Sequence, residues 1–244
     1  MNQIVQDAAR LYVPAQRPVH GSQLDAILYI NLATRPDRLQ KMQQTLAYLQ
    51  TFATHIERIN AISHTNGGKG CALSHLKAFD RILESKWDTV LILEDDATLD
   101  MQPADLYRAI QALLQTPFDV VVCGSEIYDH AMDHTPGALY CALTDAQCTT
   151  AYLIRKQYVP VLRHVWAYCV DQLSNTMVQP EYKQYAIDQA WKRLFPLHSW
   201  WWICGNPFRQ YANYSDIEHK HVDYARWTPR TLKEPLQVWN VQLE

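Results

Sequence analysis

The sequence lacks the features that mark several broad classes of protein. No apolar run approaches the roughly 20 residues that a membrane-spanning helix requires; Val90–Leu93 and Val120–Cys123 are typical. Lysine and arginine total 22 against 25 acidic residues, so the basic surface of a nucleic-acid binder is missing and no nucleic-acid partner is expected. Charged residues make up 19% and hydrophobic residues 48%, which excludes a disordered acidic chain and provides for one large core.

The cysteines and the first residues also exclude common arrangements. The six cysteines form no C-x-x-C pair, which argues against a structural zinc site. Residues 1–23 lack the basic start and apolar stretch of a secretory signal. We therefore expect reduced, buried thiols and a cytoplasmic protein, with peripheral attachment to a membrane left open. The cysteines are Cys71, Cys123, Cys141, Cys148, Cys169 and Cys204.

The first half of the chain alternates between strand and helix signals. Ala26–Leu32 is a short apolar run rich in β-formers, and Thr34 can cap the helix that follows. The other expected elements are a strand at 55–62, a flexible loop at 66–70, a helix after that loop, a strand at 89–93, a helix at 103–115 and a strand at 119–123. This alternation predicts an α/β domain with a mostly parallel central sheet flanked by helices.

The second half is less regular. We expect a strand at 149–154, helices at 158–168 and 187–194, and a tail from Gly205 onward without a clear period. Trp200, Trp201 and Trp202 stand in a further strand segment, 198–204. Neighbouring side chains on a strand alternate between faces, so at least one tryptophan is expected in the core, and we assign Trp201 there.

Three carboxylates, Glu94, Asp95 and Asp96, stand directly after the clearest buried strand. Such close like charges repel one another unless a cation is present, and a divalent metal that bridges a diphosphate would remove the repulsion. Ligands of parallel α/β sheets bind beyond the carboxyl ends of the strands. The triplet is therefore a candidate site, with a solvated acidic turn as the alternative interpretation.

Two other segments carry candidate binding residues. Arg35 and Arg38 lie at a strand-to-helix junction, where they and the helix N-terminus can meet a phosphate; alternatively they are surface charges. Gly70 precedes a helix and lets backbone approach a ligand closely. Ser74 and His75 follow on that helix and could point into a site, although a histidine there is also compatible with a structural role.

The order and spacing of three motifs resemble glycosyltransferase family 25, which includes lipopolysaccharide and collagen galactosyl- and glucosyltransferases. The motifs are YINLATRPDR at 29–38, GCALSHLKAFDRIL at 70–83 and VLILEDDA at 90–97. AYLIRK at 151–156, Asp188 and Ser215–Ile217 match more weakly. The resemblance implies a GT-A-like nucleotide-diphospho-sugar-binding fold. It divides the chain into a lead-in arm (1–24) and a single domain (25–244), with a donor-binding half (25–125) and an acceptor half with the C-terminal tail (126–244).

The resemblance also implies the reaction, which is inverting transfer of a hexose, galactose or glucose, from a UDP-sugar to an acceptor hydroxyl. It implies a D-x-D type motif that binds Mn²⁺ or Mg²⁺. Here the first acid is Glu94, so the motif does not determine which acid of the triplet binds the metal. We expect Asp96 to bind the metal, and Glu94 or Asp95 to hold the ribose or a metal-bound water.

Further roles follow from the same resemblance. Asn31 and Leu32 are expected to contact the base or ribose, with Arg35 and Arg38 near the nucleotide. His219, in the polar tail, is expected to complete the metal shell; an exposed charged loop is the alternative interpretation.

An inverting transfer needs a general base on the acceptor side. We assign Asp188, which stands where a short helix begins and where the helix dipole would keep it ionised. A simple first-turn acid is the alternative, and the rival bases are His198, Asp216 and His219.

Two functions of other classes stay open. A metal-dependent phosphohydrolase would also use strand-end acids, although its common type carries a nucleophilic Asp on the first strand, where this chain has Asn31. A non-catalytic sugar-nucleotide-binding module is the other alternative. The acceptor (a glycan, a lipid-linked sugar or a protein hydroxyl), the donor sugar and the oligomeric state are not determined by the sequence.

Overall fold

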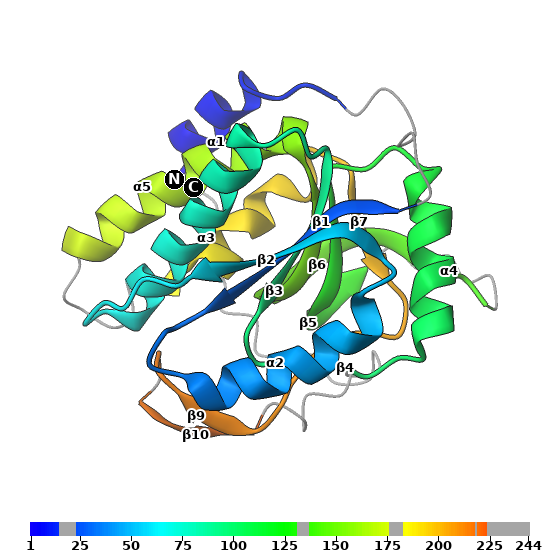
Figure 1. The fold of residues 1–244 in the computed structure, drawn as a ribbon. Helices are drawn as coiled ribbons and strands as arrows, with labels where there is room; N and C mark the ends of the chain where they lie inside the picture. Colours follow the sequence, from blue (N-terminus) through cyan, green and yellow to red (C-terminus); the bar gives the residue numbers. More distant parts are fainter. Residues whose placement is uncertain (15–22, 131–136, 176–182, 218, 224–244) are drawn as a thin grey trace.

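The computed structural model describes residues 1–14, 23–130, 137–175, 183–217 and 219–223, and it is built on one six-stranded sheet (Figure 1). The strand order is β2-β1-β3-β6-β5-β7. The strands are β1 (Leu24–Asn31), β2 (Ala53–Asn60), β3 (Thr89–Glu94), β5 (Val120–His130), β6 (Tyr140–Arg155) and β7 (Trp200–Ile203). Pairings show that β6 runs opposite to the other five, so the predicted α/β class with a mostly parallel sheet is confirmed.

Helices cover both faces of this sheet. α1 (Asn2–Ala9), α3 (Gly67–Glu84) and α5 (Val159–Asn175) lie on one face, and α2 (Pro36–Leu49) and α4 (Pro103–Leu114) lie on the other (Figure 1). Shorter pieces are α7 (Ile187–Ala190) and the 3₁₀ turns η1 (Lys156–Tyr158) and η2 (Trp191–Leu194). Two small antiparallel pairs complete the fold: β4 (Ala97–Leu99) with β8 (Phe208–Gln210), and β9 (Asn213–Ser215) with β10 (Lys220–Val222).

The central strands are apolar on both faces because helices cover both. Along β3, Val90 and Ile92 pack into the core beneath α3 and α5, whereas Leu91 and Leu93 pack beneath α2 and α4. A buried strand of this kind reads as a continuous apolar run, which is why its position was predictable.

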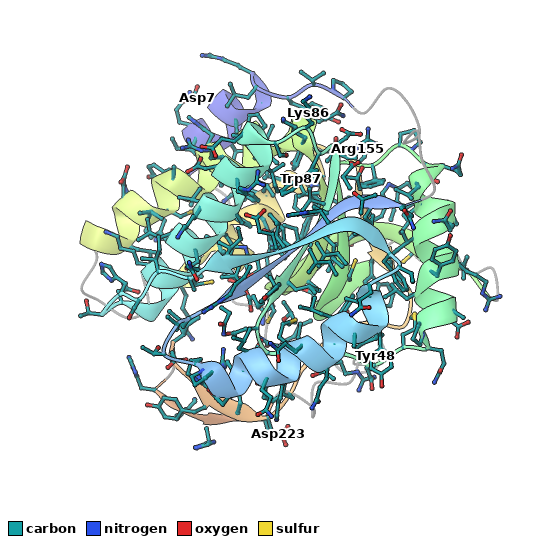
Figure 2. All side chains as sticks on the ribbon, in the orientation of Figure 1. Asp7, Tyr48, Lys86, Trp87, Arg155 and Asp223 are labelled. Atoms are coloured by element: carbon teal, nitrogen blue, oxygen red, sulfur yellow. The ribbon has the colours of Figure 1, made fainter. Side chains whose placement is uncertain are left out.

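The N-terminal segment packs onto the domain. Val5 and Ala8 of α1 are buried, and α1 contacts α5, while Asp7 lies on its outer surface (Figure 2). The Tyr12 hydroxyl donates a hydrogen bond of 2.9 Å to Asp119, just before β5. Within the described residues, no helix has both the length and the apolarity to span a bilayer.

Two predicted boundaries in the first half were wrong. Thr34 does not cap α2; the N-cap position is Arg35, and no side chain caps it. The expected flexible loop at 66–70 is instead the start of α3, because the Asn66 side chain caps the helix by accepting from the Lys69 amide. Gly67 is needed there for close packing, since a Cβ at this position would lie 2.7 Å from the Ile217 Cα.

The second half also differs in detail. β5 and β6 extend well beyond the predicted segments because they pair with each other through several register shifts. The tail from Gly205 contains β8, β9 and β10, each only three residues long, too short for periodicity to reveal. Trp200 and Trp202 are buried whereas Trp201 is only partly so, so the alternation was predicted correctly but its phase was wrong.

Candidate active site

The acidic triplet lies where the parallel strands β1 and β3 end. Asn31 is the last residue of β1 and Glu94 is the last residue of β3, and the register of the two strands pairs Ile30 with Glu94. The Asn31 side-chain amide donates a hydrogen bond of 2.7 Å to Asp95. The motif at 29–38 therefore meets the motif at 90–97 where the two strands end, as the topology of parallel strands requires.

Arg38 forms ion pairs with two acids of the triplet. Its guanidinium lies 2.8 Å from an oxygen of Asp95 and 3.4 Å from an oxygen of Asp96. All three side chains are almost completely buried. Burial opposes the charge on Arg38, but Asp96 and Asp95 outweigh this effect, so the pKa of Arg38 lies above its ordinary value.

One arginine does not fully compensate two buried aspartates. Burial raises the pKa of Asp96 to about 7; Arg38 opposes the rise, and the charges of Glu94 and Asp95 add to it. Burial also raises the pKa of Asp95, although Arg38 and Asn31 act against that rise. The site therefore has a deficit of positive charge near neutral pH, which a cation could relieve.

This deficit predicts that Asp96 destabilises the metal-free protein. An acid whose pKa is raised by folding binds more protons in the folded state, so stability falls as pH rises between its unfolded value, near 4, and about 7. We expect Asp96→Asn to stabilise the metal-free protein by about 1–3 kcal/mol above pH 7, with the gain vanishing towards pH 4. Urea denaturation in EDTA across this pH range measures it, and a pH-independent difference would contradict the assignment.

Glu94 belongs to a second hydrogen-bond network, which it forms with His75 and Thr149. His75 Nε2 lies 3.2 Å from Glu94 Oε1, and the Thr149 hydroxyl donates to the same oxygen at 2.6 Å. Burial raises the pKa of Glu94, but the hydrogen bond and charge of His75 and the bond from Thr149 outweigh it, so the pKa lies below its ordinary value. Glu94 therefore stays ionised next to Asp96, which is readily protonated. The pKa of Glu94 is thus lowered whereas that of Asp96 is raised, a difference that the sequence did not predict.

Hydrogen bonds connect the C-terminal strand pair β9–β10 to the start of α2. Arg35 donates to Asp216 at 2.6 Å and to the Tyr214 carbonyl at 3.0 Å. Arg38 contacts the same carbonyl at 2.9 Å and the side chain of Asn213. Arg38 thus connects the tail to the triplet, whereas Arg35 connects the tail to the start of α2. Figure 1 shows β9 and β10 beside the first turn of α2.

Other predicted binding residues have internal partners. The Ser74 hydroxyl donates to the Gly70 carbonyl at 2.6 Å and accepts from the Ile62 amide at 2.8 Å, so it joins α3 to the segment before it. Gly70 approaches its own chain, since a Cβ there would lie 2.7 Å from the Ile62 carbonyl oxygen. Leu32, partly buried, accepts from the Arg35 amide in the turn after β1.

Asp188, the predicted base, lies in the first turn of α7, where the charge of Glu94 acts on it. Its carboxylate accepts a hydrogen bond of 3.0 Å from the Cys148 amide in β6. The φ angle of Cys148 is 72°. Burial raises the pKa of Asp188, and the charge of Glu94 adds to the rise. We expected the dipole of a helix to keep Asp188 ionised, but α7 has only four residues, and desolvation by burial is the largest effect on the pKa of Asp188.

The rival bases lie elsewhere. His198 packs against Tyr12 and Tyr158 at the end of the sheet where β5 and β7 begin, and burial lowers its pKa to about 4. Asp216 is paired with Arg35, and His219 is exposed in the turn between β9 and β10 with φ of 53°. For Asp188, in contrast, the charge of Glu94 contributes to the raised pKa.

Two residues of the tail enter the site without having been predicted. The Gln210 side-chain amide lies 3.4 Å from Glu94 and 3.3 Å from Asp96. The Tyr211 amide donates to the Asp96 carbonyl, and burial followed by the charge of Asp96 raises the pKa of its hydroxyl to about 12. β8 brings them there by pairing with β4, directly after the triplet. A three-residue strand gives no periodic signal that could have revealed them.

The donor set around Asp96 fits a hard divalent cation such as Mn²⁺ or Mg²⁺. Asp95 and Asp96 supply carboxylate oxygens, and the buried Asn31 Oδ1 has no hydrogen-bond partner among the described residues. Within the described parts of the chain, neither His219 nor Asp95 nor Asp96 belongs to a cluster of three potential His, Cys, Asp or Glu ligands. The one such cluster combines Cys71, His75 and Glu94.

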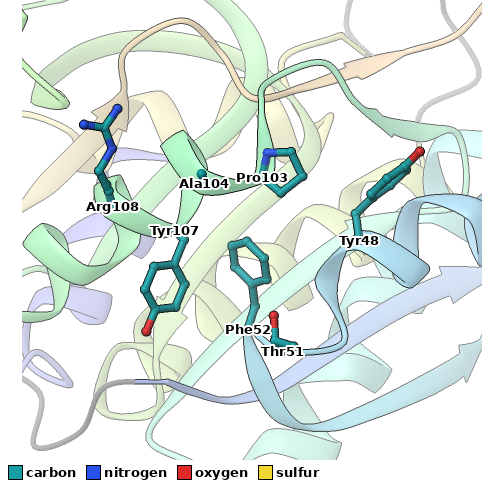
Figure 3. A pocket seen from close by; sticks show the side chains of 7 residues that line it. All are labelled: Tyr48, Thr51, Phe52, Pro103, Ala104, Tyr107 and Arg108. Carbon is teal, nitrogen blue, oxygen red and sulfur yellow. The ribbon is translucent and has the colours of Figure 1, made fainter.

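A hollow far from the triplet lies between the end of α2 and the start of α4 (Figure 3). Tyr48 and Phe52 line it from the α2 side, and Pro103, Tyr107 and Arg108 line it from α4. No carboxylate or imidazole lines it.

Comparison with known proteins gives a family match and distant structural likenesses. A search of curated proteins found no match. A197 from STIV is 13% identical with a TM-score of 0.43 (82% of this chain, 93% of that one). A glycosyltransferase involved in glycosylation of the major capsid of PBCV-1 is 12% identical with a TM-score of 0.44 (75% and 93%). Mannose-1-phosphate geranyltransferase from Thermus thermophilus is 9% identical with a TM-score of 0.46 (75% of each chain).

The family match spans the segment that carries most of the described site. Residues 60–173 match the family described as "Glycosyltransferase family 25 (LPS biosynthesis protein)". This range contains α3 with His75, the acidic triplet and Thr149, whereas the arginine motif of residues 29–38 precedes it. This match supports assignment to glycosyltransferase family 25 and, with it, a glycosyltransferase activity.

Proposed function

We propose that this glycosyltransferase moves a hexose, galactose or glucose, from a UDP-sugar to an acceptor hydroxyl with inversion and with the help of Mn²⁺ or Mg²⁺. The observation that carries the proposal is the buried group of Asp95, Asp96 and Arg38 where β1 and β3 end. It combines carboxylates that can hold a divalent cation with an arginine that can bind a phosphate. Such a pairing suits a metal-bound nucleotide diphosphate.

The donor side would be organised by α2 and the triplet. Arg38 and Arg35 would bind diphosphate oxygens, for which Arg38 exchanges its contacts to Asp95 and Asp96. Asp96, with Asp95, would hold the metal ion, which when bound supplies positive charge to the departing diphosphate. Glu94, which stays ionised, would orient a ribose hydroxyl or a metal-bound water.

On the acceptor side Asp188 would take the proton of the attacking hydroxyl as its oxygen bonds to the sugar carbon and the bond to the diphosphate breaks. Its raised pKa makes the carboxylate a better base than an exposed aspartate. The Cys148 amide fixes the position of one oxygen. Attack from the side opposite the leaving group inverts the sugar carbon.

Incubation of the metal-stripped protein with labelled UDP-sugars, with and without Mn²⁺, tests the proposal. Metal-dependent release of UDP, with slow donor hydrolysis when no acceptor is present, is the expected result. Release of phosphate from simple phosphate esters would indicate a phosphohydrolase. Binding of UDP-sugars without turnover in a panel of sugar and peptide acceptors would indicate a binding module.

The exchange of partners by Arg38 predicts effects of opposite sign. Arg38→Gln should weaken binding of UDP by about 1.5–3 kcal/mol, the range for a hydrogen bond to a charged group. The same variant should bind Mn²⁺ more tightly when UDP is absent, because Arg38 no longer competes for Asp95 and Asp96. Isothermal titration calorimetry with each ligand alone measures both effects.

Arg163→Gln is the matched control, because Arg163 pairs with Asp80 at an exposed position between α5 and α3. It should change neither affinity. Unchanged UDP affinity in a folded Arg38→Gln protein would remove Arg38 from the donor site, and weakened Mn²⁺ binding would show that it does not compete with the metal.

A further inference from the structure

Cys71, His75 and Glu94 form a cluster that the proposed transfer reaction does not use as a unit. Cys71 and His75 stand one helical turn apart on α3, so their side chains share one face. That face meets the end of β3, and one ligand atom from each of the three residues lies within 4.8 Å of the others. A thiol and an imidazole from α3 therefore meet a carboxylate from β3. His75 and Glu94 are 19 residues apart in the sequence.

We propose that this cluster is a Zn²⁺ site, separate in its ligands from the Asp95–Asp96 pair. Ligand atoms about 2.0–2.3 Å from a tetrahedral zinc ion lie roughly 3.3–3.8 Å apart, and His75 Nε2 already lies 3.2 Å from Glu94 Oε1. Thiolate and imidazole favour Zn²⁺ over Mn²⁺ and Mg²⁺, which prefer oxygen ligands. Three protein ligands leave the fourth position to water. The C-x-x-C pairs of structural zinc sites are not needed, because α3 supplies two ligands and β3 the third.

The surroundings hold two of the ligands in place. The Tyr152 hydroxyl lies 2.9 Å from His75 Nδ1, and the His75 ring packs against Trp166 with centroids 5.4 Å apart. With Nδ1 engaged, Nε2 is the nitrogen that faces Glu94. The Thr149 hydroxyl orients the carboxylate. Partners of this kind fix the orientation of metal ligands and are themselves important for affinity.

Binding has a defined proton balance and a functional consequence. The Cys71 thiol gives its proton to solvent as the sulfur binds Zn²⁺, so affinity rises with pH. Bound Zn²⁺ occupies Oε1 of Glu94 and thus withdraws this acid from the triplet. We therefore expect Zn²⁺ to inhibit transfer; this consequence rests on the proposed function, whereas the binding itself does not.

Titration of the metal-stripped full chain with Co²⁺ and then Zn²⁺ tests the site without a sugar substrate. One Co²⁺ bound by the wild type should give a thiolate-to-cobalt charge-transfer band, and Zn²⁺ should displace this ion. Cys71→Ala should lose the band and bind Zn²⁺ at least about tenfold more weakly, and Tyr152→Phe should weaken binding by about 10–100-fold. Cys204→Ala is the matched control, because Cys204 is also a partly buried cysteine and its variant should retain the band.

A wild-type cobalt complex without a thiolate band would overturn the proposal, and this measurement requires no variant. Unchanged Zn²⁺ affinity in folded Cys71→Ala would do the same. If the proposed sugar transfer failed, Zn²⁺ binding would be unaffected, so the two proposals fail separately.

Discussion

Replacing Asp96 by alanine is expected to lower the rate of sugar transfer by about 10³-fold or more while the protein stays folded. A metal ion that stabilises a leaving group contributes several kcal/mol, and each 1.36 kcal/mol corresponds to a factor of ten in rate. Asp96 is the best placed ligand, because burial raises its pKa to about 7 and a cation would relieve the cost of its charge. Initial rates of UDP release at saturating Mn²⁺ measure the loss.

The fold of the Asp96→Ala protein is checked by circular dichroism and by its urea midpoint, which should not fall. Asp105→Ala is a suitable control, since Asp105 lies in the first turn of α4 and forms only an exposed ion pair with Arg108. If EDTA leaves the wild-type rate unchanged, the metal role of Asp96 is wrong. If Asp96→Ala keeps more than about a tenth of the activity, its place at the centre of the reaction is wrong.

Replacing Asp188 by asparagine is expected to lower kcat by about 10²–10⁴-fold, the usual contribution of a general base. The amide oxygen of asparagine can still accept from the Cys148 amide, so the side chain keeps its position and loses only its basicity. Binding of UDP should not change, because the proposed donor contacts come from α2 and the triplet. Rates with acceptor and calorimetry with UDP separate the two quantities.

The pH profile gives a second measure of the same residue. Burial raises the pKa of Asp188, so the acid limb of kcat/KM should lie above pH 4 in the wild type and disappear in any residual activity of Asp188→Asn. His198→Ala serves as the control for the rival base and should retain transfer. A folded Asp188→Asn enzyme with an unchanged rate would exclude Asp188, and the same loss in His198→Ala would favour the rival.

The part of the site that could be predicted consists of residues at the ends of regular elements. β3 is an uninterrupted apolar run that stops at Glu94, and β1 stops at Asn31, so both strand ends could be located from composition alone. Parallel strands place their carboxyl ends on one edge, and this rule was enough to bring Arg38 near the triplet. In the structure, Arg38 contacts Asp95 and Asp96, as this rule leads one to expect.

The roles of individual side chains could not be predicted in the same way. Ser74 and His75 are neighbours in one motif, yet Ser74 bonds to the backbone of its own helix while His75 contacts Glu94. Successive helical residues point about 100° apart, and which of them faces the strand end depends on how α3 rotates as it packs against the sheet. Sequence spacing does not fix that rotation.

The sequence by itself determined the α/β class, the order of the early elements and the position of the acidic triplet, because these depend on patterns within a few residues. Tertiary structure decided which groups surround the triplet. β6 enters between β3 and β5 in the opposite direction and brings Thr149 to Glu94. β8 pairs with β4 and brings Gln210 to Asp96. These contacts join residues 55 and 114 positions apart, and their geometry comes from strand pairing and packing, which no local pattern encodes.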